Sequence, residues 1–117
     1  MAKTIMIVDD ERDIRDLVKI ILEKNKYDVV TAVDGDDCLK KMKAAKPDLI
    51  LMDLKMPGTP VKEVAKKIKG TKIIYLSGLS SSDAEIEGKL NPKGLVNFLP
   101  KPFGIDDLLK AVKSAIG

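Results

Sequence analysis

Hydrophobic positions along the chain form two alternating patterns, short continuous runs and longer segments with helical spacing. Five runs are apolar at nearly every position, at residues 5–8, 29–32, 49–52, 73–76 and 96–99. Such runs are typical of strands that are buried on both faces of a parallel sheet. Between the runs, apolar residues recur every three or four positions in segments near residues 14–22, 38–45, 61–68 and 105–116. This spacing predicts amphipathic helices with one buried face.

The segment at residues 80–90 has a weaker helical pattern than the other four. Its apolar pair is Ile86 and Leu90, it contains Gly88, and it runs into Asn91-Pro92, which is a stop signal for a helix. We therefore expect a short helix there. Strands that alternate with helices predict a parallel sheet with right-handed crossovers, and hence a doubly wound α/β domain with helices on both faces.

Length and composition limit the classes of protein that this chain can represent. The 117 residues suit one domain, and the net charge of +3 comes from 21 basic and 18 acidic residues without a basic block. The chain has no histidine and one cysteine, Cys38, which we expect to be a buried core residue. No apolar run reaches membrane-spanning length, and no signal-peptide pattern is present. We expect a single cytoplasmic domain over residues 1–117, with no direct nucleic-acid binding and no membrane attachment.

Residues with reactive or charged side chains follow four of the predicted strands. Asp9 and Asp10 follow the first strand, Asp53 the third, Ser77 the fourth, and Lys101 the fifth. In doubly wound sheets, functional groups gather beyond the carboxyl ends of the strands. The sequence therefore predicts that these side chains share one edge of the sheet.

Each of these residues also has a purely structural explanation. Asp10 could cap the following helix, Asp53 could begin a turn, and Ser77 could simply end a strand. Three carboxylates at neighbouring strand ends would repel one another, however, unless a cation lies among them. Mg²⁺ prefers oxygen ligands, and an aspartate carboxylate can accept a phosphoryl group. The combination favours phosphoryl chemistry, in which Lys101 and the ion would supply positive charge.

The chain resembles the receiver domains of two-component signalling, the family that includes the chemotaxis response regulators. The matching residues are Ile7-Val8-Asp9-Asp10, the segment from Asp53 to Met56-Pro57, Ser77-Gly78 and Lys101-Pro102-Phe103. The resemblance implies a flavodoxin-like (βα)5 fold with a five-stranded parallel sheet of order 2-1-3-4-5 and a cis Lys101-Pro102 bond. It implies that Asp53 is the phosphoacceptor and that Lys101 contacts the phosphoryl group. It also implies Mg²⁺, with Mn²⁺ as a substitute, held by Asp9, Asp10, Asp53 and the backbone carbonyl of Lys55.

The same resemblance implies a switch and a set of partners. Ser77 matches the switch serine or threonine, and Phe98 matches the switch aromatic residue, which would repack the surface of the fourth helix, fifth strand and fifth helix. The phosphoryl donor would be a sensor histidine kinase or a histidine phosphotransfer protein. The downstream target would be a protein, and the chain would be a monomer or a weak dimer. As a switch, the domain would catalyse only its own phosphorylation and dephosphorylation.

Some residues depart from the family pattern, and three alternatives stay open. Thr59-Pro60 stands where many receivers have an acidic residue or Asn followed by Gly, and residues 60–70 are short for a third helix with its loop. A phosphatase of the haloacid dehalogenase type would need a second aspartate where Lys55 stands. A flavodoxin-type carrier would need a phosphate-binding loop after the first strand, where Asp9-Asp10 would repel the phosphate. A degenerate receiver would serve only as a protein-interaction module.

Overall fold

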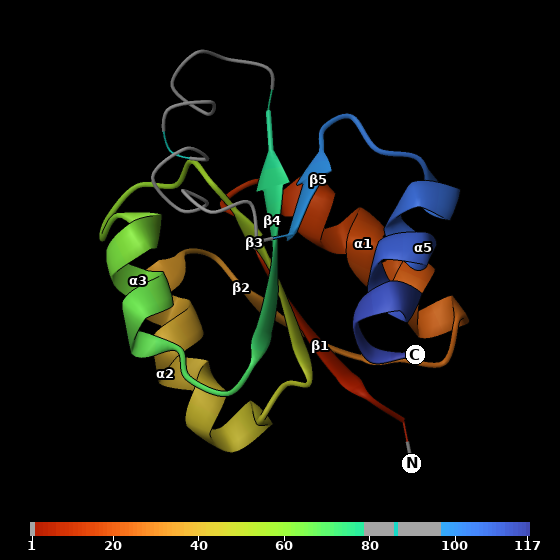
Figure 1. The fold of residues 1–117 in the computed structure, drawn as a ribbon, viewed down its shortest axis with the longest axis horizontal. Coiled ribbons are helices and arrows are strands. Elements are labelled where there is room, and N and C mark those ends of the chain that lie inside the picture. The colour runs from red at the N-terminus through yellow and green to blue at the C-terminus, as the bar shows by residue number, and fades with distance from the viewer. Residues whose placement is uncertain (1, 79–85, 87–96) are drawn as a thin grey trace.

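The computed structural model describes residues 2–78, 86 and 97–117 (Figure 1). Its centre is a five-stranded sheet in the order β2-β1-β3-β4-β5, and every neighbouring pair of strands is parallel. The strands are β1 (Thr4–Val8), β2 (Asp28–Ala32), β3 (Leu49–Asp53), β4 (Lys72–Ser77) and β5 (Asn97–Pro100). Each of the five predicted strands is confirmed to within one or two residues, and so are the parallel sheet and its strand order.

Of the helices that the structure describes, two pack on each face of the sheet (Figure 1). On one face lie α1 (Arg12–Lys24) and α5 (Ile105–Ile116), and on the other lie α2 (Gly35–Ala45) and α3 (Val61–Lys67). The expected shortness of the third helix is confirmed, because α3 has seven residues and its C-cap, Ile68, is already extended. The predicted helix at residues 80–90 lies outside the described residues except for Ile86.

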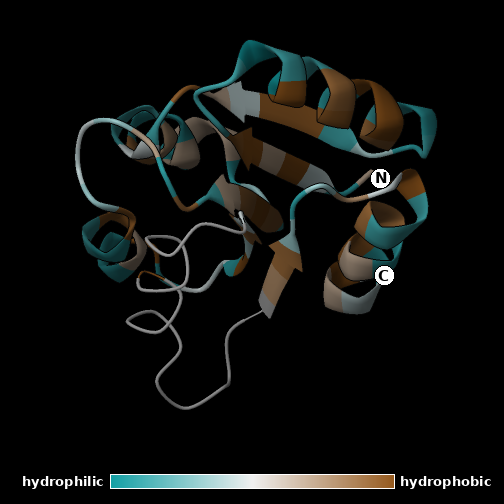
Figure 2. Cartoon of the chain, turned by 90° about the horizontal axis from the view of Figure 1, so that it is seen from above, coloured by the Kyte–Doolittle hydropathy of each residue, from teal (hydrophilic) through white to brown (hydrophobic). Residues whose placement is uncertain are grey.

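Alternating side chains of the strands divide the core into two clusters. Ile5 and Ile7 pack toward α1 and α5, whereas Met6 and Val8 pack toward α2 and α3. Cys38 is fully buried in the second cluster, which confirms its predicted core role. Figure 2 shows the strands coloured mostly as hydrophobic residues, as expected of a sheet that is covered on both sides.

The register of the strands brings their carboxyl ends to one level. Val8 pairs with Met52, so the residues that follow them, Asp9 and Asp53, lie side by side. Ser77 pairs with Pro100, which places Lys101 one position beyond that pair. The sheet itself therefore gathers the acids, the serine and the lysine at one edge. Among the helices that the structure describes, none has the length and apolar character needed to cross a membrane.

Candidate functional site

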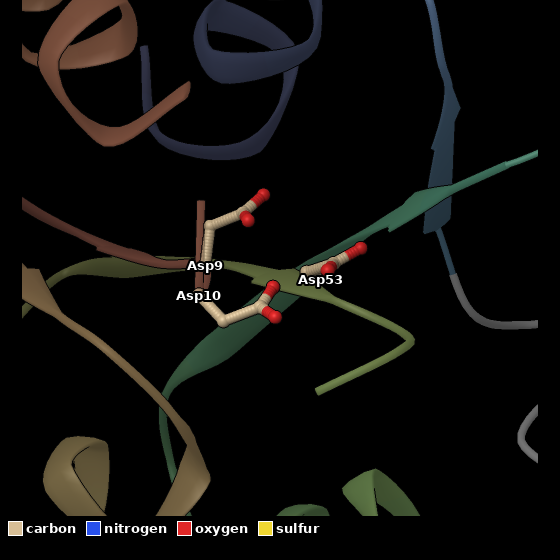
Figure 3. Close-up of side chains that lie close together, drawn as sticks. All are labelled: Asp9, Asp10 and Asp53. Atoms are coloured by element: carbon tan, nitrogen blue, oxygen red, sulfur yellow. The ribbon is translucent and has the colours of Figure 1, made fainter. Parts of the chain in front are cut away.

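Three carboxylates from two neighbouring strand ends form the centre of the site (Figure 3). Asp9 is fully buried, Asp53 is 7% exposed, and Asp10 is exposed to solvent. One oxygen atom from each of the three lies within 4.8 Å of the other two. Figure 3 shows Asp9 and Asp10 extending in different directions from the end of β1, with Asp53 beside them at the end of β3. The predicted acidic cluster is present in the structure.

Lys101 places its ammonium group between two of these acids. Its Nζ atom lies 3.1 Å from Asp9 Oδ2 and 3.0 Å from Asp53 Oδ1. The backbone N–H of Lys101 donates to the carbonyl oxygen of Ser77 at 2.6 Å, which holds the end of β5 against β4. The Lys101-Pro102 peptide bond is cis, as expected from the family resemblance. Lys101 thus partly neutralises two carboxylates that are largely removed from water.

The charges of the cluster change the ionisation of its members. Burial, and then the neighbouring charge of Asp9, raises the pKa of Asp53 to about 6, although the hydrogen bond from Lys101 lowers it. Burial acts to lower the pKa of Lys101, but the hydrogen bonds and charges of Asp53 and Asp9 outweigh this effect and raise it. After burial, the expected repulsion from the neighbouring acids is therefore a further cause of the raised pKa of Asp53. Lys101 stays protonated at neutral pH.

The turn that carries Asp9 and Asp10 is held by two hydrogen bonds to Asp9. Its Oδ1 atom accepts from the N–H of Glu11 at 2.9 Å, and its backbone carbonyl accepts from Arg15 Nη1 at 2.7 Å. The capping role considered for Asp10 is wrong, because the N-cap of α1 is Glu11, and Asp9 binds the N–H there. Arg15 was not predicted as a site residue. Nothing in the sequence distinguishes it from other helical arginines, since its target is a backbone atom six residues earlier.

The other predicted site residues, Ser77, Lys55 and Phe98, differ in their position relative to the cluster. Ser77 is buried, one position beyond Leu76, which pairs with Asp53. Lys55 is exposed in the loop after β3. Phe98 lies on β5, is partly buried and stacks obliquely on Tyr75, with ring centroids 5.6 Å apart. Phe98 is thus part of the α2–α3 side of the core and contributes no atom to the acidic cluster.

The chemistry of the donor atoms fits a hard divalent cation. Carboxylate oxygens are the ligands that Mg²⁺ prefers, and this cluster offers one from each of three residues. A cation placed there would offset the repulsion that raises the pKa of Asp53. The same fit holds for Mn²⁺, which also takes oxygen ligands.

Comparisons with known proteins agree with this geometry. Residues 5–113 match the family described as the response regulator receiver domain. The alkaline phosphatase synthesis transcriptional regulatory protein PhoP of Bacillus subtilis is 36% identical over 99% of this chain. The chain spans only 49% of the length of that relative.

Solved structures show the same likeness. The chemotaxis response regulator CheY4 of Vibrio cholerae superposes with a TM-score of 0.84 and 32% identity, over 99% of this chain and all of that one. The receiver domain of a LuxO repressor protein from Vibrio parahaemolyticus gives a TM-score of 0.84 with 26% identity, over 98% of this chain and 90% of that one. Proteins of this family are signalling switches, and receiver domains bind Mg²⁺ through acidic residues. With its strand order, its acidic edge and a family match over most of its length, the chain belongs to the response regulator receiver domains of two-component signalling.

Proposed function

We propose that this chain is a phosphorylation switch in which Asp53 accepts a phosphoryl group from a phosphohistidine. The observation that carries the proposal is the contact of Asp53 with Lys101 beside Asp9 and Asp10. A lone buried aspartate would be a structural residue, whereas these neighbours supply the charges that phosphoryl transfer requires. The family assignment leaves the phosphatase and flavin-carrier alternatives without support.

Asp53 would act as the nucleophile of a single displacement. One of its carboxylate oxygens bonds to phosphorus while the P–N bond to the donor histidine breaks. The leaving nitrogen keeps the electron pair of that bond, and the histidine leaves as neutral imidazole because its other ring nitrogen retains its proton. Lys101 lies where it can hold a phosphoryl oxygen as negative charge develops. A bound Mg²⁺ or Mn²⁺ would neutralise charge on the phosphoryl oxygens. Its ligands would be Asp9, Asp10, Asp53 and the Lys55 carbonyl.

The surface beside Lys101 suits a protein donor. A groove of about 500 Å³ opens there, lined by Ile14 and Leu17 of α1 and by Phe103 after Lys101. Leu17 is 52% exposed although it is a large apolar residue. Apolar surface next to a reactive group is typical of a docking site for another protein. A sensor histidine kinase or a histidine phosphotransfer protein could bring its phosphohistidine to Asp53 by this route.

The output of the switch would pass through Ser77 and Phe98. Phosphorylation places about two negative charges on the phosphoryl group of Asp53, and these would attract the Ser77 hydroxyl and the Lys101 ammonium. The main chain of Lys101 is already bonded to Ser77, and Phe98 lies three residues before Lys101. A shift of Ser77 and Lys101 would therefore move the strand that carries Phe98 and change how a target protein binds the face that β5 and α5 contribute to. We propose that the domain acts as a monomer or weak dimer and does not itself bind nucleic acid.

Intact-mass measurement after incubation with acetyl phosphate and Mg²⁺ tests the proposal. The wild-type chain should gain the mass of one phosphoryl group, and Asp53→Asn should gain none. Asp106→Asn is the matched control, because it removes an exposed acid in the first turn of α5 and should leave the adduct unchanged. No adduct on the wild-type chain with saturating Mg²⁺ would overturn the proposal and favour a receiver that only binds other proteins.

A further inference from the structure

The loop after the phosphoacceptor, residues 54–60, is tied to the first turn of α2. Thr59 Oγ1 donates a hydrogen bond of 2.8 Å to Asp36 Oδ1. At its other end, the N–H of Leu54 donates to the carbonyl oxygen of Leu76 at 3.2 Å. Lys55, whose carbonyl is expected to bind the metal ion, lies between these two anchors. The loop is therefore held by β4 at its start and by α2 at its end.

The loop and the first turn of α2 also lie close together, as the small space around two glycines shows. Gly58 has a φ of +92°, and a Cβ atom on it would lie 3.2 Å from Asp36 Oδ2. One residue before Asp36, a Cβ atom on Gly35 would lie 2.4 Å from Val64 Cγ2 in α3. Glycine at both places lets the first turn of α2 lie directly against the loop and against α3. The hydrogen bond of Asp36 thus lies at the surface, where the first turn of α2 approaches the loop closely.

We propose that Asp36 is a positioning residue, which holds the loop after β3 in the conformation that the divalent ion requires. The inference rests on the proposed function and names a residue outside the acidic cluster. Thr59-Pro60 departs from the family pattern at this loop, and the Asp36 carboxylate supplies a partner for the hydroxyl that this departure introduces. Without the bond, the loop would lose one of its two anchors, and ordering it around an ion would cost conformational entropy.

If Asp36 served only to stabilise α2, its charge would matter and its hydrogen bond to Thr59 would not. An acidic residue in the first turn of a helix interacts favourably with the helix dipole whatever its side chain binds. Asp106 holds the same second position in α5, on the opposite face of the sheet. Asp106→Ala therefore removes a comparable charge without touching the loop and serves as the matched control.

Binding of Mn²⁺ to the unphosphorylated chain, measured by electron paramagnetic resonance, tests the inference. Asp36→Ala and Thr59→Val each remove the hydrogen bond and should weaken binding about 3- to 10-fold, the worth of one such bond. Asp36→Asn removes the charge but keeps an acceptor oxygen, and should bind nearly as wild type does. The double variant Asp36→Ala/Thr59→Val should be no weaker than either single one, because both lose the same bond. Asp106→Ala should match wild type.

Other outcomes overturn the inference in distinguishable ways. Equal affinity of wild type, Asp36→Ala and Thr59→Val would overturn it while leaving the proposed function intact. Binding by Asp36→Asn as weak as that by Asp36→Ala would assign the effect to charge and overturn it too. Failure of wild type to bind Mn²⁺ would overturn both this inference and the metal-dependent function. Thermal unfolding without divalent ions checks folding, and Thr59→Val carries the test if Asp36→Ala does not fold.

Discussion

The ammonium nitrogen of Lys101 lies 3.0 Å from Asp53 Oδ1, although 48 positions of the chain separate the two residues. The contact joins the end of β5 to the end of β3, across β4. It places a cation against a carboxylate whose pKa burial raises to about 6. The pKa of Asp53 therefore depends on Lys101, because both the hydrogen bond and the charge of the lysine lower it.

Replacing Lys101 with methionine should raise the pKa of Asp53 further above 6. The side chain keeps most of its apolar length but loses the hydrogen bond and charge that lower this pKa. An opposite charge at this distance commonly moves a carboxyl pKa by about 1 unit or more. A carbon-13 NMR titration of the aspartate carboxyl groups in the absence of divalent ions measures the shift. Lys110→Met, in an exposed part of α5, is the control and should not move it.

Asp53 should make the protein less stable as the pH rises from about 4 to about 6. Its pKa is 3.8 unfolded but about 6 folded, so in this window the native state holds the proton and the unfolded state has released it. The native state then binds more protons, and the free energy of unfolding falls with increasing pH. Above pH 6, ionised Asp53 would cost about 3 kcal/mol.

Urea unfolding of wild type and Asp53→Asn across this pH range, without divalent ions, isolates the effect. Asn cannot ionise, so the variant should gain stability relative to wild type as the pH rises, up to about 3 kcal/mol at neutral pH. Added Mg²⁺ should narrow the difference, because it binds the ionised form. Parallel curves for the two proteins would show that Asp53 titrates with an ordinary pKa.

The strands and the strand-end residues could be predicted because both depend on local patterns. A run such as Ile5-Met6-Ile7-Val8 is apolar at each position, and a strand buried on both faces buries every side chain of such a run. The alternation of strands and helices predicts that Asp9 and Asp53 lie at the same edge of the sheet. The family resemblance adds the strand order that makes their strands neighbours. The shortness of the third helix is also predicted from the sequence, because only residues 60–70 are available for this helix and its loop.

Contacts that involve backbone atoms or depend on exact spacing could not be predicted. Arg15 binds the carbonyl oxygen of Asp9, and a carbonyl has no signature in the sequence. Asp36 meets Thr59 across 23 positions because α2 and α3 pack closely, which depends on Gly35 facing Val64. Aspartate favours the N-cap position, which makes Asp10 a candidate, but the N-cap of α1 is Glu11, one residue later. Capping preference is too weak to decide between adjacent acids.

Cys38 should be unreactive in the folded protein. Burial, followed by the nearby charge of Asp37, raises its pKa to about 11 from an ordinary value of 9.0. Because the thiolate is the nucleophile, ionisation alone should slow alkylation at neutral pH about 100-fold, and burial should slow it further. The rate of iodoacetamide modification, followed by intact mass with and without urea, measures this. Rapid labelling without urea would mean that α2 opens readily.

Gly35→Ala should destabilise the protein even though alanine favours helices. A Cβ atom on residue 35 would lie 2.4 Å from Val64 Cγ2, so α2 and α3 would have to separate. Overpacking of this kind costs about 1–3 kcal/mol, against a gain of about 1 kcal/mol in helix propensity. We expect a net loss of up to about 2 kcal/mol in the free energy of unfolding, measured by urea denaturation.

Combining Gly35→Ala with Val64→Ala separates this steric cause from a general effect on α2. The second substitution removes the methyl group that the new Cβ atom would strike, so the double variant should be more stable than the sum of the two single losses predicts. A coupling of about 1 kcal/mol or more would assign the loss to this contact. Ala44→Gly, at an exposed position of α2, is the control and should show no coupling with Val64→Ala. Additive losses for Gly35→Ala and Val64→Ala would mean that the two helices can separate freely at this point.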